Sequence, residues 1–248
     1  MKINSLVTRK KYNNDIIFRI IDIQGNKVML KGEVVRLIAD ADKEDLRLFS
    51  VEEKKTVVLP KLKEEPNVIK GKILHIDGDE YYLKKAMDTY SKYNIYALGY
   101  YIKESDMPNK IKDLLITHRP DIIVITGHDA LQSTNNKNDE KAYKNSKYFI
   151  ECVKICRMIN PNKDDLIIIA GACQSFYEKL IEEGANFASS PTRSNIHLLD
   201  PIIIASFIAN YRINQEIDIE YILSNTISKS IGGIETKGKA RKVFVGGK

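Results

Sequence analysis

The stretch DIIVITGHD at residues 121–129 decides the fold class of this chain. Its first part is a run of β-branched residues without polar alternation, which is typical of a strand buried on both faces of a parallel sheet. Further apolar runs predict strands at residues 72–76, 95–102, 166–170 and 186–188. Amphipathic stretches between the strands predict helices at residues 80–93, 108–117, 147–159 and 175–183. This alternation predicts a mostly parallel, doubly wound α/β sheet with helices on both faces.

The first 50 residues follow a different pattern. Short runs of alternating or β-branched residues are separated by the turn signals Gly25-Asn26 and Lys31-Gly32, and they lie at residues 15–23, 27–30 and 34–38. Several short strands joined by such turns are typical of a small barrel or curled sheet. We therefore expect residues 1–50 to form a small SH3-like β domain.

Between these two regions, residues 51–70 are highly charged and contain Pro60 and Pro66, which interrupt helices. They predict a linker. The α/β domain is then expected to occupy residues 71–236, followed by a basic C-terminal tail at residues 237–248.

Charge and composition narrow the class of protein. The net charge of +6 is concentrated at the ends, because residues 71–236 carry 19 basic and 22 acidic residues while residues 237–248 carry five basic and no acidic ones. A slightly acidic body fits a positively charged polypeptide better than nucleic acid. The apolar runs are far shorter than the roughly 20 residues of a membrane span. Three cysteines cannot all pair, which favours a reducing, intracellular setting.

Chemically active residues stand where three of the predicted strands end, and ligands bind beyond these ends in doubly wound sheets. Asp77 and Asp79 follow the first strand, Gly127, His128 and Asp129 follow the third, and Cys173 follows the fourth. A cysteine between a buried strand and a helix start is expected near the positive end of the helix dipole, which favours the thiolate. Histidine exchanges protons near neutral pH. His128 and Cys173 therefore predict an acid/base and nucleophile pair, with backbone N–H groups of Cys173 and of the turn at residues 127–129 binding an oxyanion.

The remaining cysteines and histidines have simpler interpretations. Cys152 and Cys156 lie one helical turn apart among apolar residues, so they are predicted to be core residues. His197 is the main competitor of His128 for the acid/base role. His75 and His118 are weaker candidates.

The order of His128 and Cys173, 45 residues apart and each following an apolar strand, resembles that of the caspase-like (clan CD) cysteine peptidases. Gly127 precedes the histidine and Gly171 stands where the caspase pattern has Gln, so the match is to the arrangement rather than to the full motif. A narrower resemblance extends over nearly the whole chain. The chain resembles the YabG sporulation-specific peptidases of spore-forming bacteria in the strings RLIADADKEDL, HIDGDEYYLKK, RPDIIVITGHDA, IAGACQS, GANFASSPTRSNIHLLDP and GGIETKG.

That resemblance implies an arginine-preferring cysteine endopeptidase that processes spore-coat and germination proteins in the mother cell cytoplasm or the spore coat. Cys173 would be the nucleophile and His128 the general acid/base, with no metal or organic cofactor. Recognition of arginine calls for a carboxylate. We expect the specificity pocket among residues at two strand ends, namely Asp77, Asp79, Ser189 and Ser190. Asp129 is expected to orient His128 or to supply its N–H, and Asp79 is also a candidate helix cap.

Two further expectations complete the interpretation. Self-cleavage is expected in exposed basic sequence, with Arg47 and Arg241 as candidate sites. The alternatives are a Mg²⁺-dependent phosphohydrolase that uses Asp77 and Asp79, and a non-enzymatic spore-coat assembly protein. Thiol reactivity confined to Cys173 would separate the peptidase from both.

Overall fold

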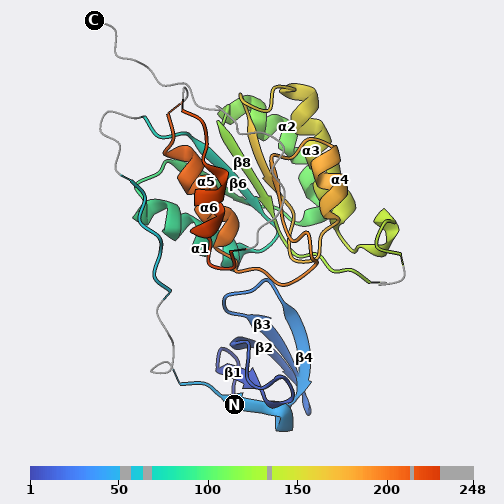
Figure 1. The fold of residues 1–248 in the computed structure, drawn as a ribbon. Helices are drawn as coiled ribbons and strands as arrows, with labels where there is room; N and C mark the ends of the chain where they lie inside the picture. Colours follow the sequence, from blue (N-terminus) through green and yellow to red (C-terminus); the bar gives the residue numbers. More distant parts are fainter. Residues whose placement is uncertain (51–56, 64–68, 133–135, 213–214, 230–248) are drawn as a thin grey trace, which may run out of the picture. The chain divides into compact units, whose positions relative to one another are not determined.

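The computed structural model describes residues 1–50, 57–63, 69–132, 136–212 and 215–229. The chain divides into two compact units, Met1–Leu59 and Pro60–Lys248, which are described separately (Figure 1). Much of the predicted linker and all of the basic tail lie outside the described residues. Pro60 and Leu62, in the middle of the predicted linker, already belong to the second unit: the Pro60 carbonyl accepts a 2.8 Å hydrogen bond from the Tyr93 hydroxyl, and Leu62 packs against the core of this unit.

The first unit is a five-stranded antiparallel sheet in the order β4-β3-β2-β1-β5. Its strands are β1 (Leu6–Arg9), β2 (Phe18–Gln24), β3 (Lys27–Gly32), β4 (Ile38–Asp42) and β5 (Leu46–Leu48). The predicted strand at residues 34–38 is wrong. The Gly32 N–H bonds to the Leu37 carbonyl and closes a tight turn there, so β4 begins only at Ile38. The sequence pattern also missed β1 and β5, which are short.

The second unit contains a five-stranded, fully parallel sheet in the order β10-β9-β8-β6-β7. Its strands are β6 (Ile73–Asp77), β7 (Ala97–Tyr101), β8 (Ile122–Thr126), β9 (Ile167–Ala170) and β10 (Phe187–Ala188). Every one of them lies within a predicted strand or exceeds it by one residue. Counted along the chain within this sheet, the order is 2-1-3-4-5, which is a doubly wound topology with its switch point between β6 and β8.

Helices cover both faces of this sheet, as the sequence predicts (Figure 1). One face packs against α1 (Glu80–Lys92), α5 (Asp200–Ala209) and α6 (Ile219–Ser224). The other packs against α2 (Met107–His118), α3 (Ser146–Ile159) and α4 (Tyr177–Glu182). The sequence pattern did not indicate α5, because all ten of its residues are buried, all but Asp200 and Ser206 are apolar, and it shows no polar face.

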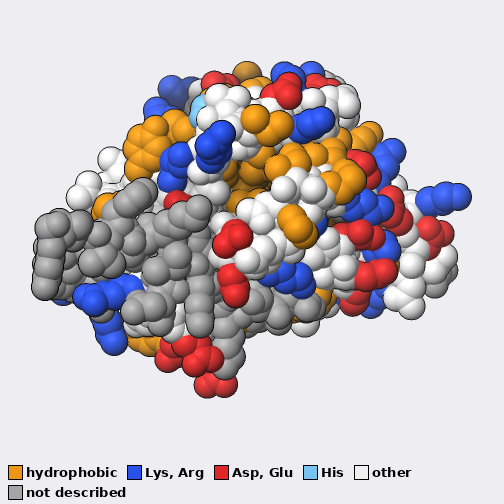
Figure 2. Space-filling view, turned by 90° about the horizontal axis from the view of Figure 1, so that it is seen from above, with side chains coloured by type: hydrophobic (Ala, Val, Ile, Leu, Met, Phe, Trp, Pro, Cys, Tyr) orange, Lys and Arg blue, Asp and Glu red, His pale blue; other side chains and the backbone are white. Residues whose placement is uncertain are grey.

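Some apolar side chains of the second unit are exposed. They include Ile116, Met158 and Ile159, which lie near the C-terminal ends of α2 and α3, at the end of the sheet opposite the loops that follow the strands. Figure 2 shows hydrophobic side chains gathered across the face seen from above, with charges of both signs around them. No helix in the described ranges is long and apolar enough to cross a bilayer. Within those ranges, no group of three or more His, Cys, Asp and Glu side chains is arranged to hold a metal ion.

Candidate active site

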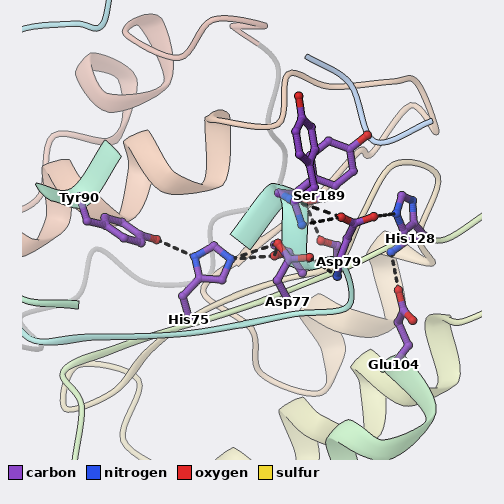
Figure 3. A network of polar contacts seen from close by, with 11 residues as sticks. His75, Asp77, Asp79, Tyr90, Glu104, His128 and Ser189 are labelled. Atoms are coloured by element: carbon purple, nitrogen blue, oxygen red, sulfur yellow. Dashed lines mark hydrogen bonds and ion pairs between the residues drawn. The ribbon is translucent and has the colours of Figure 1, made fainter. Parts of the chain in front are cut away.

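The loops after β6, β8 and β9 lie at the carboxyl edge of the sheet, and Figure 3 shows a network of polar contacts there that includes Asp79 after β6, His128 after β8 and Ser189 after β10. The pair β6 and β8 forms the switch point, where loops diverge to opposite faces and leave room for a ligand. Asp77 is the last residue of β6, Asp79 comes from the loop that follows it, and His128 comes from the loop after β8. The structure thus brings together three residues that the sequence predicted to lie at one edge.

His128 is held on three sides. Its Nε2 lies 2.8 Å from Oδ2 of Asp79, and its ring lies 5.6 Å from the ring of Tyr82, measured between centroids. Its backbone N–H donates to Oε1 of Glu104 at 2.7 Å, and its carbonyl accepts from the side-chain amide of Asn145 at 2.8 Å. Nδ1 makes no hydrogen bond within the described part of the chain. The imidazole side chain is 24% exposed, so it is fixed in orientation yet accessible.

Asp79 combines two roles that the sequence presented as alternatives. As the N-cap of α1, its Oδ1 accepts from the N–H of Tyr81 at 3.0 Å and of Tyr82 at 3.4 Å. Its other oxygen faces His128. A carboxylate that accepts from an imidazole N–H fixes the tautomer and stabilises the imidazolium, and it leaves the second ring nitrogen for proton transfer.

Asp77, also predicted to line a specificity pocket, is fully buried. Its Oδ1 accepts from the N–H of Asp79 at 2.9 Å, and its Oδ2 accepts from the hydroxyl of Thr126 at 2.9 Å. The carboxylate therefore points into the protein rather than toward a bound ligand. The contacts favour a supporting role for this side chain.

Cys173 is buried in the core on the α1 and α5 face, with only 2% of its surface exposed. Its Sγ lies 3.9 Å from the carbonyl oxygen of Ile196, a weak contact. No hydrogen bond joins the thiol to the His128 ring in the described part of the chain. The helix predicted from Ser175 is present but begins at Tyr177: residues 172–175 form a turn that separates Cys173 from α4, which has six residues. The helix dipole therefore does not account for a reactive thiolate here.

Asp129 ties the loop of Cys173 to the loop of His128. Its Oδ2 accepts from the hydroxyl of Ser175 at 2.9 Å and from that of Ser146, at the start of α3, at 2.5 Å. Its Oδ1 accepts from the N–H groups of Ala130 and Asn145. Burial raises the pKa of Asp129, and these hydrogen bonds oppose that effect. The carboxylate is engaged with these groups rather than with the His128 ring, so it positions the two loops.

Ser189 and Ser190, the other predicted pocket residues, follow β10 and are buried. The Ser189 hydroxyl donates to the Gly171 carbonyl at 3.3 Å, and Ser189 belongs to the network drawn in Figure 3. Ser190 has a left-handed φ of 61° and donates to the Ser194 carbonyl at 2.7 Å. Both residues shape the segment that runs over Cys173.

Glu104 is a site residue that the sequence analysis missed. It precedes α2, and its carboxylate lies against the backbones of Gly78 and Gly127, where an added Cβ would approach its Oε1 to 2.2 Å and 2.5 Å. Only glycine permits this close approach. The available signal was a glycine directly after each of two neighbouring strands. Because Glu104 takes the N–H of His128, that N–H is not among the groups open to an oxyanion in this state.

The other histidines and cysteines have structural surroundings. Desolvation and Lys85 lower the pKa of His197 to about 4, so it is neutral near pH 7. Its Nδ1 accepts from the Leu199 N–H at 3.2 Å, and its Nε2 has no hydrogen-bond partner among the described residues. Cys152 and Cys156 lie on α3 and are fully buried in the core between this helix and the sheet, as predicted. Burial raises the pKa of Cys152, and raises that of Cys156 to about 12.

The segment between β10 and α5 covers the Cys173 thiol and is fastened by Arg193. The Arg193 guanidinium forms a bidentate ion pair with Glu178 on α4 and donates to the Tyr143 hydroxyl at 3.0 Å and 3.1 Å. Tyr143 in turn stacks on Phe176. Arg193 also has a left-handed φ of 55°, which is uncommon for a residue with a side chain.

We expect Arg193→Gln to increase the rate of Cys173 alkylation by iodoacetamide about fivefold, the factor that corresponds to about 1 kcal/mol of easier local opening. Lys179→Gln is the matched control, because Lys179 pairs with Glu182 and Glu183 and does not touch the covering segment. Mass spectrometry of the Cys173 peptide against time gives the rate. An unchanged rate in Arg193→Gln would show that the ion pair does not restrain this segment.

Comparison with known proteins gives this geometry a biochemical class. The family model described as YabG peptidase U57 matches residues 2–66 and 52–245. The chain is 39% identical, over 279 aligned positions, to the sporulation-specific protease YabG of Bacillus subtilis (strain 168), and the alignment covers 97% of this chain and 96% of that protein. No solved structure matches. The chain is a protease, and its polar network lies where a sheet of this topology places an active site.

Within that class, the chain belongs to the YabG peptidase family. The resemblance to the YabG peptidases seen in the sequence strings is confirmed, and the Bacillus subtilis relative is named as a sporulation-specific protease. A magnesium-dependent phosphohydrolase and a non-enzymatic coat protein, the two alternatives, are excluded by this membership.

Proposed function

We propose that the protein is a cysteine endopeptidase of sporulation in which Cys173 is the nucleophile and His128 is the general acid/base. The observation that carries the proposal is the Asp79–His128 pair at the switch point, tied to the loop of Cys173 through Asp129 and Ser175. Among the described residues, this edge combines an oriented, accessible imidazole with a thiol on the neighbouring strand end. The strand order and the placement of His before Cys also support a caspase-like fold for the second unit.

The proposed reaction uses groups whose positions are defined. The thiol transfers its proton to Nδ1 of His128, which is left available because Nε2 faces Asp79. The thiolate attacks the scissile carbonyl carbon, and the oxyanion is held by backbone N–H groups of the Cys173 turn. His128 then protonates the leaving amine, the C–N bond breaks, and water hydrolyses the thioester with His128 as base. Because the thiol faces Ile196 in this state, it must rotate toward His128 when substrate binds.

Preference for arginine is part of the proposal. Recognition of a guanidinium requires a carboxylate at the site, and Asp79 lies on the site side of the network while Asp77 is buried beneath it. Ser189, in the same network, and Ser190 are proposed to line the pocket with it. The slightly acidic body of residues 71–236 supports a basic substrate.

The biological setting is inferred from the family. Spore-coat and germination proteins that contain arginine are the proposed substrates, in the mother cell cytoplasm or the coat, because the relative is a sporulation-specific protease. Processing of the chain itself after Arg47, in β5, or after Arg241, outside the described residues, is proposed as a secondary activity. An SH3-like β fold is proposed for the first unit, and its small five-stranded antiparallel sheet supports this proposal.

Selective labelling tests the identity of the nucleophile. We expect iodoacetamide at pH 8 to modify Cys173 well before Cys152 or Cys156, because burial raises the pKa of the latter two and leaves almost no thiolate. Peptide mapping of the native protein after partial modification measures this order, and loss of peptidase activity should follow labelling of Cys173. Activity that persists after complete modification of Cys173 would contradict the proposal.

A further inference from the structure

A line of buried polar side chains runs through the core toward the site, from Tyr90 on α1 to Asp77 on β6 (Figure 3). The Tyr90 hydroxyl lies 2.9 Å from Nδ1 of His75, and Nε2 of His75 lies 2.9 Å from Oγ1 of Thr126. Thr126 donates to Oδ2 of Asp77 at 2.9 Å. All four residues are at most 1% exposed. None of them can meet a substrate directly.

The direction of these hydrogen bonds follows from the donor and acceptor capacity of each group. Because Thr126 gives its proton to Asp77, its oxygen must accept from Nε2–H of His75. In the neutral imidazole, Nδ1 then accepts from the Tyr90 hydroxyl. The four groups thus form one directed chain that ends on the carboxylate, and a 3.5 Å contact of His75 Nε2 with Asp77 adds to it.

The hydrogen-bonded chain reaches the site through the carboxylate of Asp77. Oδ1 of Asp77, the oxygen that Thr126 does not use, accepts from the N–H of Asp79 at 2.9 Å. Asp79 places one oxygen on the α1 cap and the other on His128. A rotation of the Asp77 carboxylate would therefore shift the Asp79 backbone and, with it, the orientation of the His128 ring.

Packing alone does not explain these residues. Their neighbours on β6 and β8 are Ile, Leu and Val, and apolar side chains of similar volume in place of a buried polar network are often neutral or stabilising. A buried network that is fully bonded does fix geometry, because each member has one favourable arrangement. The network is therefore explained by the need of the site for a defined geometry of the Asp79–His128 pair.

We propose that Asp77 is a positioning residue for the peptidase reaction, held in place by Thr126, His75 and Tyr90, and that it sets the Asp79–His128 pair rather than binding the substrate's basic side chain. The proposal rests on the proposed function of His128 and Cys173. Asp77 was expected to line the specificity pocket, and the proposal instead gives it a supporting role beneath the pocket.

The test measures kcat and KM for peptides that differ only in Arg, Lys or Leu before the scissile bond. Thr126→Val removes the hydroxyl with little change in shape, and Asp77→Asn places a donor where acceptors are needed. We expect kcat to fall roughly ten- to hundredfold for every peptide, with KM and the ranking of peptides unchanged, since small misplacement of a catalytic group has effects of this size. Thr126→Ser keeps the hydroxyl and should retain most of the wild-type kcat. Tyr90→Phe, at the far end of the network, should lower kcat less than tenfold.

Ser206→Ala is the matched control, because Ser206 is an equally buried hydroxyl that bonds to the Ile202 carbonyl on α5, outside the network. It should leave kcat unchanged, and thermal melting of each variant confirms that the protein is folded. A folded Thr126→Val with normal kcat would overturn the proposal, and so would an Asp77→Asn that loses only its preference for arginine. Failure of the proposed function is a different result, because it would appear as full activity in a protein that lacks Cys173 or His128.

Discussion

Cys173→Ala is expected to abolish cleavage of peptides and proteins, with a loss on the order of 10⁴-fold or more, as is typical when the nucleophile of a covalent mechanism is removed. The fold should remain intact. Cys173 is a small residue in an apolar cluster, and the contact of its Sγ with the Ile196 carbonyl, at 3.9 Å, is weak. A methyl group in its place removes one sulfur atom from the core and about 1 kcal/mol of stability at most. The measurement is cleavage of a peptide library by both proteins, with circular dichroism to compare folding.

Cys152→Ala serves as the control, because Cys152 is buried on the opposite face of the sheet and takes no part in the site. It should keep the activity of the wild type. Intact masses after storage extend the experiment to self-processing: the wild type should lose mass at Arg47 or Arg241, and the Cys173 variant should not. Peptidase activity retained in Cys173→Ala would end the cysteine mechanism, whereas equal masses would count only against self-processing.

Asp79→Asn is expected to lower kcat by roughly 10²- to 10⁴-fold while leaving the melting temperature nearly unchanged, because its two oxygens act separately. Asparagine is as good an N-cap as aspartate, so α1 keeps its cap through Tyr81 and Tyr82. The amide carries no charge, however, and cannot stabilise the imidazolium of His128 or reliably hold its tautomer. Steady-state kinetics and thermal melting on the same preparations measure the two effects.

Asp79→Ala is the informative partner, since it removes both functions. It should show the same loss of kcat together with about 1 kcal/mol lower stability from the missing cap. The specificity role proposed for Asp79 appears in the same data, as a further loss confined to peptides with arginine. Normal kcat for all peptides in Asp79→Asn would show that the contact with His128 has no part in the reaction.

The parallel sheet could be predicted from the sequence because two of its central strands, Ile122–Thr126 and Ile167–Ala170, are almost continuous runs of β-branched residues. Ile122–Thr126 is the clearest of them, and a run of this kind has few alternatives to burial on both faces. The helix α5 could not be predicted in the same way, because a helix that is apolar on every side lacks the periodicity on which prediction depends. The strand predicted at residues 34–38 failed because most of these residues form the turn between β3 and β4, in which the Gly32 N–H bonds to the Leu37 carbonyl and the Leu37 N–H to the Val35 carbonyl.

The candidate site was predictable as a location but not in its contacts. Placement of His128 and Cys173 at neighbouring strand ends followed from topology, which the apolar runs define. Which oxygen of Asp79 faces His128, and that Asp77 points inward, depend on side-chain rotamers that no spacing specifies. Glu104 could not be found from its own surroundings in sequence, because its role depends on two glycines that approach it from other loops.

The carboxylate of Asp129 has a consequence for when the enzyme becomes competent during its synthesis. It bonds to Ser146, 17 residues further on, and to Ser175, 46 residues further on, while the covering segment that reaches Ile196 comes later still. A chain still emerging from the ribosome therefore carries His128 well before the loop of Cys173 can be fixed beside it. Under the proposed mechanism, an incomplete chain cannot cleave other unfolded chains near the ribosome. Peptidase activity arises only after nearly the whole second unit has been translated and folded.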